Sequence, residues 1–190
     1  MRFELGHVPM PEGYGDKILP LNDCKVHLRV LNDSEDALIA VLRDAAIEYV
    51  ERYCGVKLGP VSGMNWRAEA FGSAEVSLAV RPVTAITSIA WQDGSAETVA
   101  GDVADFRFSE SGELRPVVGG SWPASVRGDI VVTFDAGYAE GAAPPSLLHA
   151  VRLMLGHLWL NREAVVAGPV SGEVPLGVSA LCSPFRRVMI

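Results

Sequence analysis

The sequence has little cysteine and little histidine. Its three cysteines, Cys24, Cys54 and Cys182, are an odd number, and none has the Cys-x-x-Cys spacing. This pattern excludes a disulfide framework and a zinc motif as the basis of the fold, and it favours free thiols in a reducing cytoplasm. The four histidines are scattered, and His149 and His157 lie too far apart on one helix to bind the same ion. Neither a metal nor another cofactor is expected.

Long apolar runs and an excess of basic residues are absent as well. No apolar run approaches the roughly 20 residues that cross a bilayer, and residues 1–15 lack the apolar centre of a signal peptide. Lysine and arginine total 16 against 23 aspartates and glutamates, a net charge of −7. Because no segment is apolar enough to span a bilayer, we expect no membrane contact. Phosphate binding needs clustered positive charge, so we also expect no strong binding of nucleic acid.

Recognisable catalytic motifs are missing too. Gly119-Gly120-Ser121 lacks the lysine of a phosphate-binding loop, and no Gly-x-Ser-x-Gly elbow occurs. Glu110 and Glu113 are close in sequence, but no neighbouring group indicates acid–base chemistry. We therefore expect no enzymatic activity. An enzyme of unfamiliar design stays open, and a buried pocket of convergent titratable groups would indicate it.

The strongest positive signal is a helix over residues 144–163. Two prolines stand at its start, where a helix tolerates them, and Ser146 is the predicted cap. Its predicted core face consists of Leu148, Val151, Leu155 and Leu158. Because the polar strip of this helix is narrow, we expect burial from more than one direction. The residues predicted to meet a neighbouring subunit are Leu153, Trp159 and Leu160.

A second helix is expected over residues 34–54, ended by Gly55 as a left-handed cap. The helical period assigns its core face to Leu38, Leu42, Ala45, Tyr49 and Tyr53. Its charged residues are expected on the outside: Arg43, Asp44, Glu48, Glu51 and Arg52. A short helix is expected before it, around Cys24.

Between these helices, from Val61 to Tyr138, the hydrophobic period changes to two, which indicates short antiparallel strands. The strongest is Ile130 to Phe134, and Asp93-Gly94 predicts a hairpin turn. The predicted fold class is therefore α+β, a small helical bundle with an inserted antiparallel β module. The predicted parts are an extended N-terminal arm (1–21), a helical core (22–58 and 144–183), the inserted β module (59–143) and a C-terminal tail (184–190).

Four segments give the chain a resemblance to a known family. Each is short, and together they span about residues 22 to 187. They are residues 36–58 with the ending Glu51-Arg52-Tyr53-Cys54-Gly55; Arg81-Pro82-Val83; Val131 to Tyr138 followed by Pro145 and Asn161-Arg162-Glu163; and Pro175 to Val178, Ala180-Leu181 and Pro184-Phe185-Arg186. In this order they resemble the head–tail connector (adaptor) proteins of long-tailed bacteriophages and of phage-derived gene transfer agents. Cys54 departs from the threonine that is frequent there in the family.

The resemblance implies a structural protein of a virion or phage-like particle, made in the bacterial cytoplasm. It implies a ring, typically of twelve subunits, that docks under the portal protein, extends the DNA channel without specific DNA binding, and presents a surface to the next stopper or tail-terminator protein. A protein-binding module unrelated to phage, of the same mixed fold and without catalysis, is the alternative.

The end of the chain mixes apolar and basic residues. Pro184 is expected to stop the preceding helix, so the tail cannot simply continue it. Apolar residues at a free end gain little in water, which favours docking of the tail on the portal. The predicted portal-contacting residues are Phe185, Arg186, Arg187, Val188, Met189 and Ile190. Folding of this tail back onto its own subunit stays open.

Overall fold

The protein folds into two compact units, each built from two separate stretches of chain. The structure is a computed structural model, and it describes residues 3–6, 8–71, 75–124, 126, 128–162 and 176–186. The β unit comprises Met1–Pro11 and Pro60–Tyr138, and the helical unit comprises Glu12–Gly59 and Ala139–Ile190. Helices in one unit and antiparallel sheets in the other confirm the predicted α+β class.

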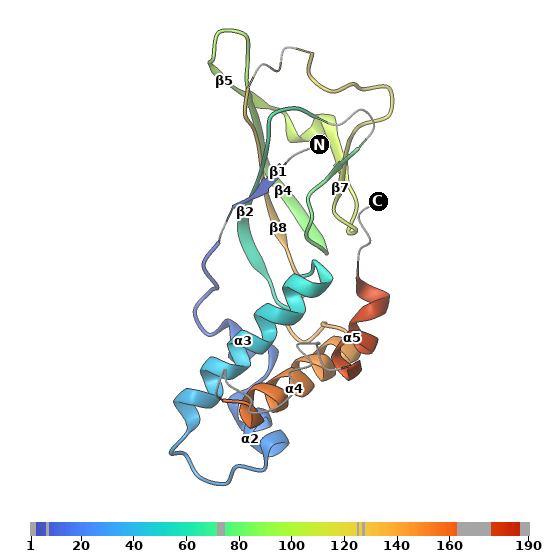
Figure 1. Ribbon diagram of the computed structural model, residues 1–190. Coiled ribbons are helices and arrows are strands. Elements are labelled where there is room, and N and C mark those ends of the chain that lie inside the picture. Colours follow the sequence, from blue (N-terminus) through green and yellow to red (C-terminus); the bar gives the residue numbers. More distant parts are fainter. Residues whose placement is uncertain are drawn as a thin grey trace, which may run out of the picture. The chain divides into compact units, whose positions relative to one another are not determined.

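The helical unit is organised around α3 and α4, which pack against each other (Figure 1). The shorter α1 and α2 contact α3, and α5 packs against α4. The elements are α1 (Tyr14–Ile18), α2 (Leu21–Leu28), α3 (Asp36–Cys54), α4 (Pro145–Leu160), α5 (Leu176–Cys182) and the 3-10 helix η2 (Ser183–Phe185). Gly55 follows α3 with φ 65°, which confirms the predicted left-handed cap.

The buried face of α3 differs from the predicted one by a rotation of about one residue. The residues that α3 buries are Ile39, Arg43, Ala46, Ile47, Val50, Glu51 and Cys54. Ala45 is exposed and Tyr49 is only half-buried, although both were predicted for the core. Apolar residues occur all round this helix, so its period alone does not select one face.

The short N-terminal helix α1 explains why α3 buries charged residues. The segment predicted as an extended arm instead forms β1 (Phe3–Leu5) and α1. From α1, Asp16 contacts the Arg43 guanidinium at 2.5 Å, and the Tyr14 hydroxyl donates a hydrogen bond of 2.5 Å to Glu51. Arg43 and Glu51 can therefore be buried because they have partners there.

On α4 the prediction is partly confirmed. Val151 and Leu155 are fully buried, together with Leu147 and Ala150, whereas Leu148 and Leu158 are only half-buried. Pro144 is the N-cap and Pro145 the first helical residue, and no side chain caps the helix, so the predicted Ser146 cap is wrong.

Arg152 and Gly156 belong to the narrow polar strip of α4, and α2 partly covers this strip. Arg152 lies 3.9 Å from Asp23, and Gly156 lies close to His27. This contact accounts for the burial of α4 from a second direction.

The β unit holds a five-stranded antiparallel sheet in the order β1-β2-β8-β4-β5 and a three-stranded sheet in the order β3-β7-β6. The strands are β2 (Val61–Ala68), β3 (Val76–Ser77), β4 (Val83–Gln92), β5 (Thr98–Gly101), β6 (Phe106–Phe108), β7 (Glu113–Pro116) and β8 (Ile130–Ala136), with the 3-10 helix η1 (Val103–Asp105) before β6. The strand predicted as strongest, β8, is the central strand of the larger sheet. Its buried residues Ile130, Val132 and Phe134 alternate with half-buried ones, as a strand between core and surface requires.

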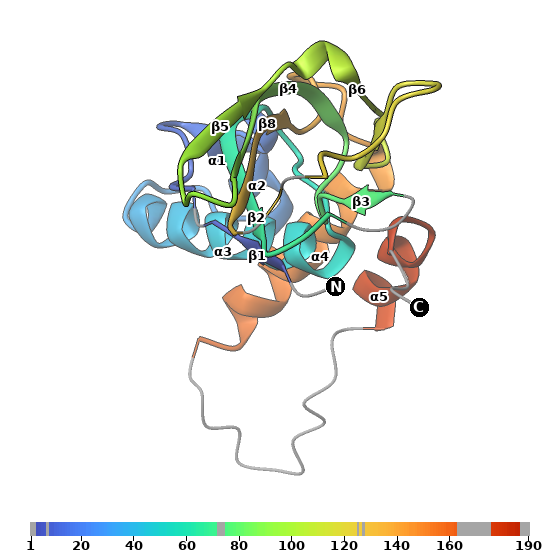
Figure 2. The ribbon, with the colours of Figure 1, turned by 90° about the horizontal axis from the view of Figure 1, so that it is seen from above.

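The long strand β4 is irregular, with register shifts between Val83 and Ala85 and between Ile86 and Ser88. Such bulges bend a strand, and Figure 2 shows β4 curved. The β4–β5 connection is the turn predicted from Asp93-Gly94, and the Asp93 carboxylate accepts hydrogen bonds from the backbone N–H groups of Ser95 and Glu97.

Candidate interaction surface

The side of α3 that faces away from the core is apolar in its first half and charged in its second. We call this set the outer face of α3: Leu38, Val41, Ala45, Glu48 and Arg52. Val41 is 65% exposed and Leu38 is 37% exposed. Glu48 and Arg52 pair at 3.8 Å, and both are largely in solvent, so the pair contributes little stability. An exposed valine and leucine one turn apart indicate a surface suited to a partner.

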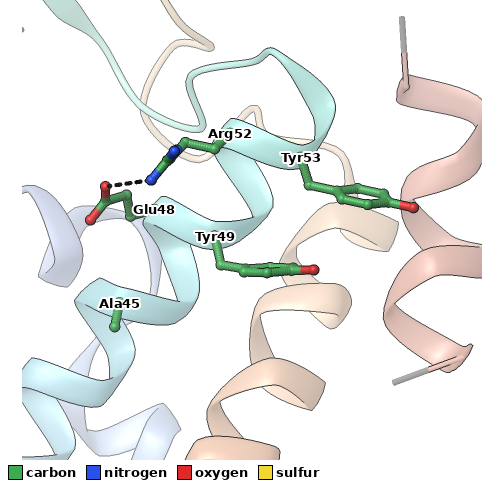
Figure 3. Close-up of a pocket in the computed structure, with 5 residues that line it drawn as sticks. All are labelled: Ala45, Glu48, Tyr49, Arg52 and Tyr53. Carbon is green, nitrogen blue, oxygen red and sulfur yellow. Dashed lines mark ion pairs between the residues drawn. The ribbon is translucent and has the colours of Figure 1, made fainter. Parts of the chain in front are cut away.

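The second half of the outer face borders an open pocket of about 550 Å³, the tyrosine pocket, lined by Ala45, Glu48, Tyr49, Arg52 and Tyr53. Figure 3 shows the two tyrosine rings pointing the same way from successive turns of α3, with the Glu48–Arg52 pair on the other side of the helix. The rings stack, with centroids 6.1 Å apart and an interplanar angle of 14°. Burial, and then the neighbouring Tyr53, raise the pKa of Tyr49.

The end of α4 carries the three residues predicted for a subunit interface, and the structure places them differently. Leu160 is 81% exposed. Trp159 is half-buried, with the Arg162 guanidinium 3.9 Å from its ring centroid. Arg162 also pairs with Glu35 at 2.6 Å, which ties the end of α4 to the start of α3. Leu153 is half-buried and lies close to Gly177 of α5, so it serves packing within the subunit.

The first residues of the predicted C-terminal tail lie on the helical unit. Helix α5 ends at Cys182, and Pro184 and Phe185 belong to η2. Phe185 is half-buried, and the Arg186 guanidinium lies 5.2 Å from the centroid of the Tyr53 ring. The predicted tail therefore does not leave the subunit at Pro184, because residues 184–186 lie on the helical unit. Arg187, Val188, Met189 and Ile190 lie outside the described residues.

The buried titratable groups have structural partners. Glu51, 2% exposed, accepts hydrogen bonds from the Tyr14 hydroxyl at 2.5 Å and the Leu58 N–H at 2.8 Å, and it pairs with Lys57 at 2.6 Å. Burial and then the adjacent Glu51 charge raise the pKa of Tyr14. Burial likewise raises the pKa of the Cys24 thiol to about 11, which makes it a poor nucleophile at neutral pH.

Neither a metal centre nor a membrane span is found in the part of the chain that the structure describes. No three or more histidine, cysteine, aspartate or glutamate side chains gather there closely enough to hold a metal ion. None of its helices is both long and apolar enough to cross a bilayer.

Residues 19–99 match the family model described as phage gp6-like head-tail connector protein. This match confirms the resemblance to connector proteins. The matched segment runs from the end of α1 through α2 and α3 into the turn of the β4–β5 hairpin and the first residues of β5. It thus contains the outer face of α3 and the tyrosine pocket. No curated protein matches the sequence.

Solved structures share the fold over nearly the whole chain. A chain from the "Neck of empty GTA particle computed with C6 symmetry" is 23% identical, with a TM-score of 0.75, covering 98% of this chain and 97% of that one. A chain from the "Virion of native gene transfer agent (GTA) particle" is 23% identical, with a TM-score of 0.74 and coverage of 98% and 96%. A chain from the "Neck of native GTA particle computed with C12 symmetry" is 22% identical, with a TM-score of 0.72 and coverage of 98% and 97%. The connector match and this fold together support a structural role.

Proposed function

We propose that the protein is a structural head–tail connector that forms a ring in the neck of a phage or gene transfer agent particle. The observation that carries the proposal is a fold shared over 98% of the chain with chains from two gene transfer agent neck structures. One neck was computed with C6 symmetry and the other with C12 symmetry. The connector match of residues 19–99 supports it independently. On this proposal twelve copies surround the DNA path, bind the portal on one side and receive a stopper or tail-terminator protein on the other, without catalysis.

A closed ring of identical subunits needs two different surfaces on each subunit, because the contact runs head to tail. The helical unit leaves several apolar side chains in solvent, and two groups of them lie on its long helices α3 and α4. One is the outer face of α3 with Val41, and the other is the end of α4 with Leu160 and Trp159. We assign these two regions to the contact between neighbouring subunits. We further propose that Leu153, which packs next to α5, supports this subunit contact indirectly by holding α5 in place.

The function is tested by mixing the purified chain with the portal protein of the same particle and imaging the product by electron microscopy. A ring of twelve subunits seated on the portal is the expected result. A chain that stays monomeric and leaves the portal bare would contradict the connector role and favour the unrelated binding module.

The C-terminal residues 187–190 are expected to attach the ring to the portal. Arg186 is held near Tyr53, so these four residues start from a fixed point on the helical unit. Three of them, Val188, Met189 and Ile190, are apolar, and their burial in a portal groove would stabilise the complex by a few kcal/mol at roughly 25 cal/mol per Å². Deleting 187–190 should abolish portal binding in a pull-down while the melting temperature stays unchanged. Retained binding with a large fall in melting temperature would show instead that the tail folds onto its own subunit.

DNA should pass through the ring with little friction. The net charge of −7 on each copy, repeated around the ring, repels the phosphate backbone. In a gel-shift assay we therefore expect no sequence preference and at most weak binding, which disappears as salt rises to the physiological range. Tight binding to duplex DNA at physiological salt would count against the connector role.

A further inference from the structure

The smaller sheet of the β unit carries two arginines directly opposite each other. In the β6–β7 register Arg107 pairs with Arg115, while Phe106 pairs with Pro116 and Phe108 with Leu114. Residues directly opposite in an antiparallel pair have their Cβ atoms about 5 Å apart on the same face of the sheet. Two like charges in that position destabilise the pair, so the arrangement is unfavourable for the isolated sheet.

Among the described residues, only one of the two guanidinium groups has acidic partners. Arg115 pairs with Glu75 at 2.5 Å and with Glu113 at 3.4 Å. Arg107 is exposed and has no ion pair or hydrogen bond to any of the described residues. The sheet therefore presents one satisfied and one unsatisfied guanidinium side by side.

Both arginines line a pocket of about 330 Å³ whose other walls are mostly apolar: Pro116, Val117 and Trp122, with Ser121 and Gly120 at the edge. A tight turn shapes this edge. Gly119 has φ 82°, which favours glycine, and the Gly120 N–H donates a 2.9 Å hydrogen bond to the Val117 carbonyl. Next to the pocket Val118 is 86% exposed. The pocket thus combines two cations with an apolar rim.

We propose that this pocket binds a carboxylate side chain of a partner protein, with the Arg107 guanidinium as its main ligand. A guanidinium donates two parallel hydrogen bonds to a carboxylate, which makes this group its best-fitting small anion together with phosphate. A nucleic-acid backbone fits less well, because Glu75 and Glu113 flank Arg115 and the whole chain is acidic, which repels a polyanion. The apolar rim suits the side chains that flank an acidic residue in a peptide.

The test uses the full chain with arginine side chains labelled with ¹⁵N, so that the Nε–Hε signals can be followed by NMR. The probe is a capped peptide, Gly-Val-Glu-Val-Gly, and its control replaces glutamate by glutamine. The Arg107 and Arg115 signals should shift saturably with the glutamate peptide and remain in place with the glutamine peptide. Arg107→Gln should weaken binding about tenfold or more, and Arg107→Lys should also weaken it, because a point charge replaces the fork.

The matched control is Arg67→Gln, which removes the same charge from an exposed position on β2 of the same unit. It should leave the affinity unchanged. Arg107→Gln should melt at or above the wild-type temperature, since it removes a like-charge pair, so a loss of binding cannot be ascribed to unfolding. Three results would overturn the proposal: no saturable shift, equal affinity for the glutamine peptide, or tighter binding of short duplex DNA than of the peptide at physiological salt.

Discussion

Leu155→Asp is expected to unfold the helical unit. Leu155 is fully buried on α4, among Leu147, Ala150 and Val151. The substitution removes apolar packing and places a carboxylate where no cation is available among the buried residues of this helix. Lost packing costs about 2–5 kcal/mol, and the unpaired charge adds several more. The sum approaches the whole stability of a typical domain, about 5–15 kcal/mol. Loss of the cooperative thermal transition and of helical circular dichroism would show it.

The matched control on the same helix is Leu160→Asp. Leu160 is 81% exposed, so the same chemical change there should shift the stability by no more than about 0.5 kcal/mol. In the proposed ring it should instead weaken the contact between subunits, which analytical ultracentrifugation measures. A Leu155→Asp chain that stays folded would show that the burial of α4 is wrongly assigned.

Sequence patterns that are compatible with only one local structure could be predicted from the sequence. The alternation through Ile130, Val132 and Phe134 allows only one buried face, and β8 indeed lies at the centre of its sheet. Gly55 is likewise a local signal, because a left-handed residue after a helix is strongly favoured as glycine. The α+β class follows from such local signals, which do not depend on contacts distant in sequence.

The orientation of α3 could not be predicted in the same way. Whether Arg43 and Glu51 lie in solvent or inside depends on α1, whose Asp16 is 27 residues away from Arg43 in the sequence. The proline- and glycine-rich start of the chain shows no period that would mark α1 as a helix or its side chains as partners. Charged residues were therefore assigned to solvent by their type. The outer face of α3 was missed because Leu38 and Ala45 were assigned to the core.

For the candidate site, the structure shows how exposed the predicted interface residues are, and the interface itself stays a prediction. Leu160 was expected at an interface and is exposed, whereas Leu153 packs next to α5. The helical period distinguishes faces of a single helix, but it cannot tell which flank is covered by another short helix of the same chain. The tyrosine pocket was missed because Tyr49 and Tyr53 were assigned to the core.

Replacing the buried carboxylate of Glu51 is expected to have the second-largest effect on stability, after Leu155→Asp. This one side chain satisfies the Tyr14 hydroxyl from α1, the Leu58 N–H from the segment after α3, and the Lys57 ammonium. The Tyr14 oxygen in turn accepts a 3.0 Å hydrogen bond from the Gly59 N–H. Glu51→Ala would leave the buried Leu58 N–H without its acceptor, at about 1–3 kcal/mol, and would leave the Tyr14 hydroxyl only the more distant Gly59 carbonyl at 3.3 Å. It would open a cavity as well.

We therefore expect Glu51→Ala to lower the free energy of unfolding by about 3–5 kcal/mol, measured by urea denaturation. Glu51→Gln should cost less, because the amide oxygen can still accept from Tyr14 and Leu58 while only the pairing with Lys57 is lost. Glu48→Ala is the matched control one turn earlier. Its carboxylate is 59% exposed and pairs with Arg52 only at 3.8 Å, so its loss should change the stability by less than about 0.5 kcal/mol. Equal effects of Glu51→Ala and Glu48→Ala would mean that α1 is not fastened to α3 through Glu51. In that case the burial of charge on α3 would need another explanation.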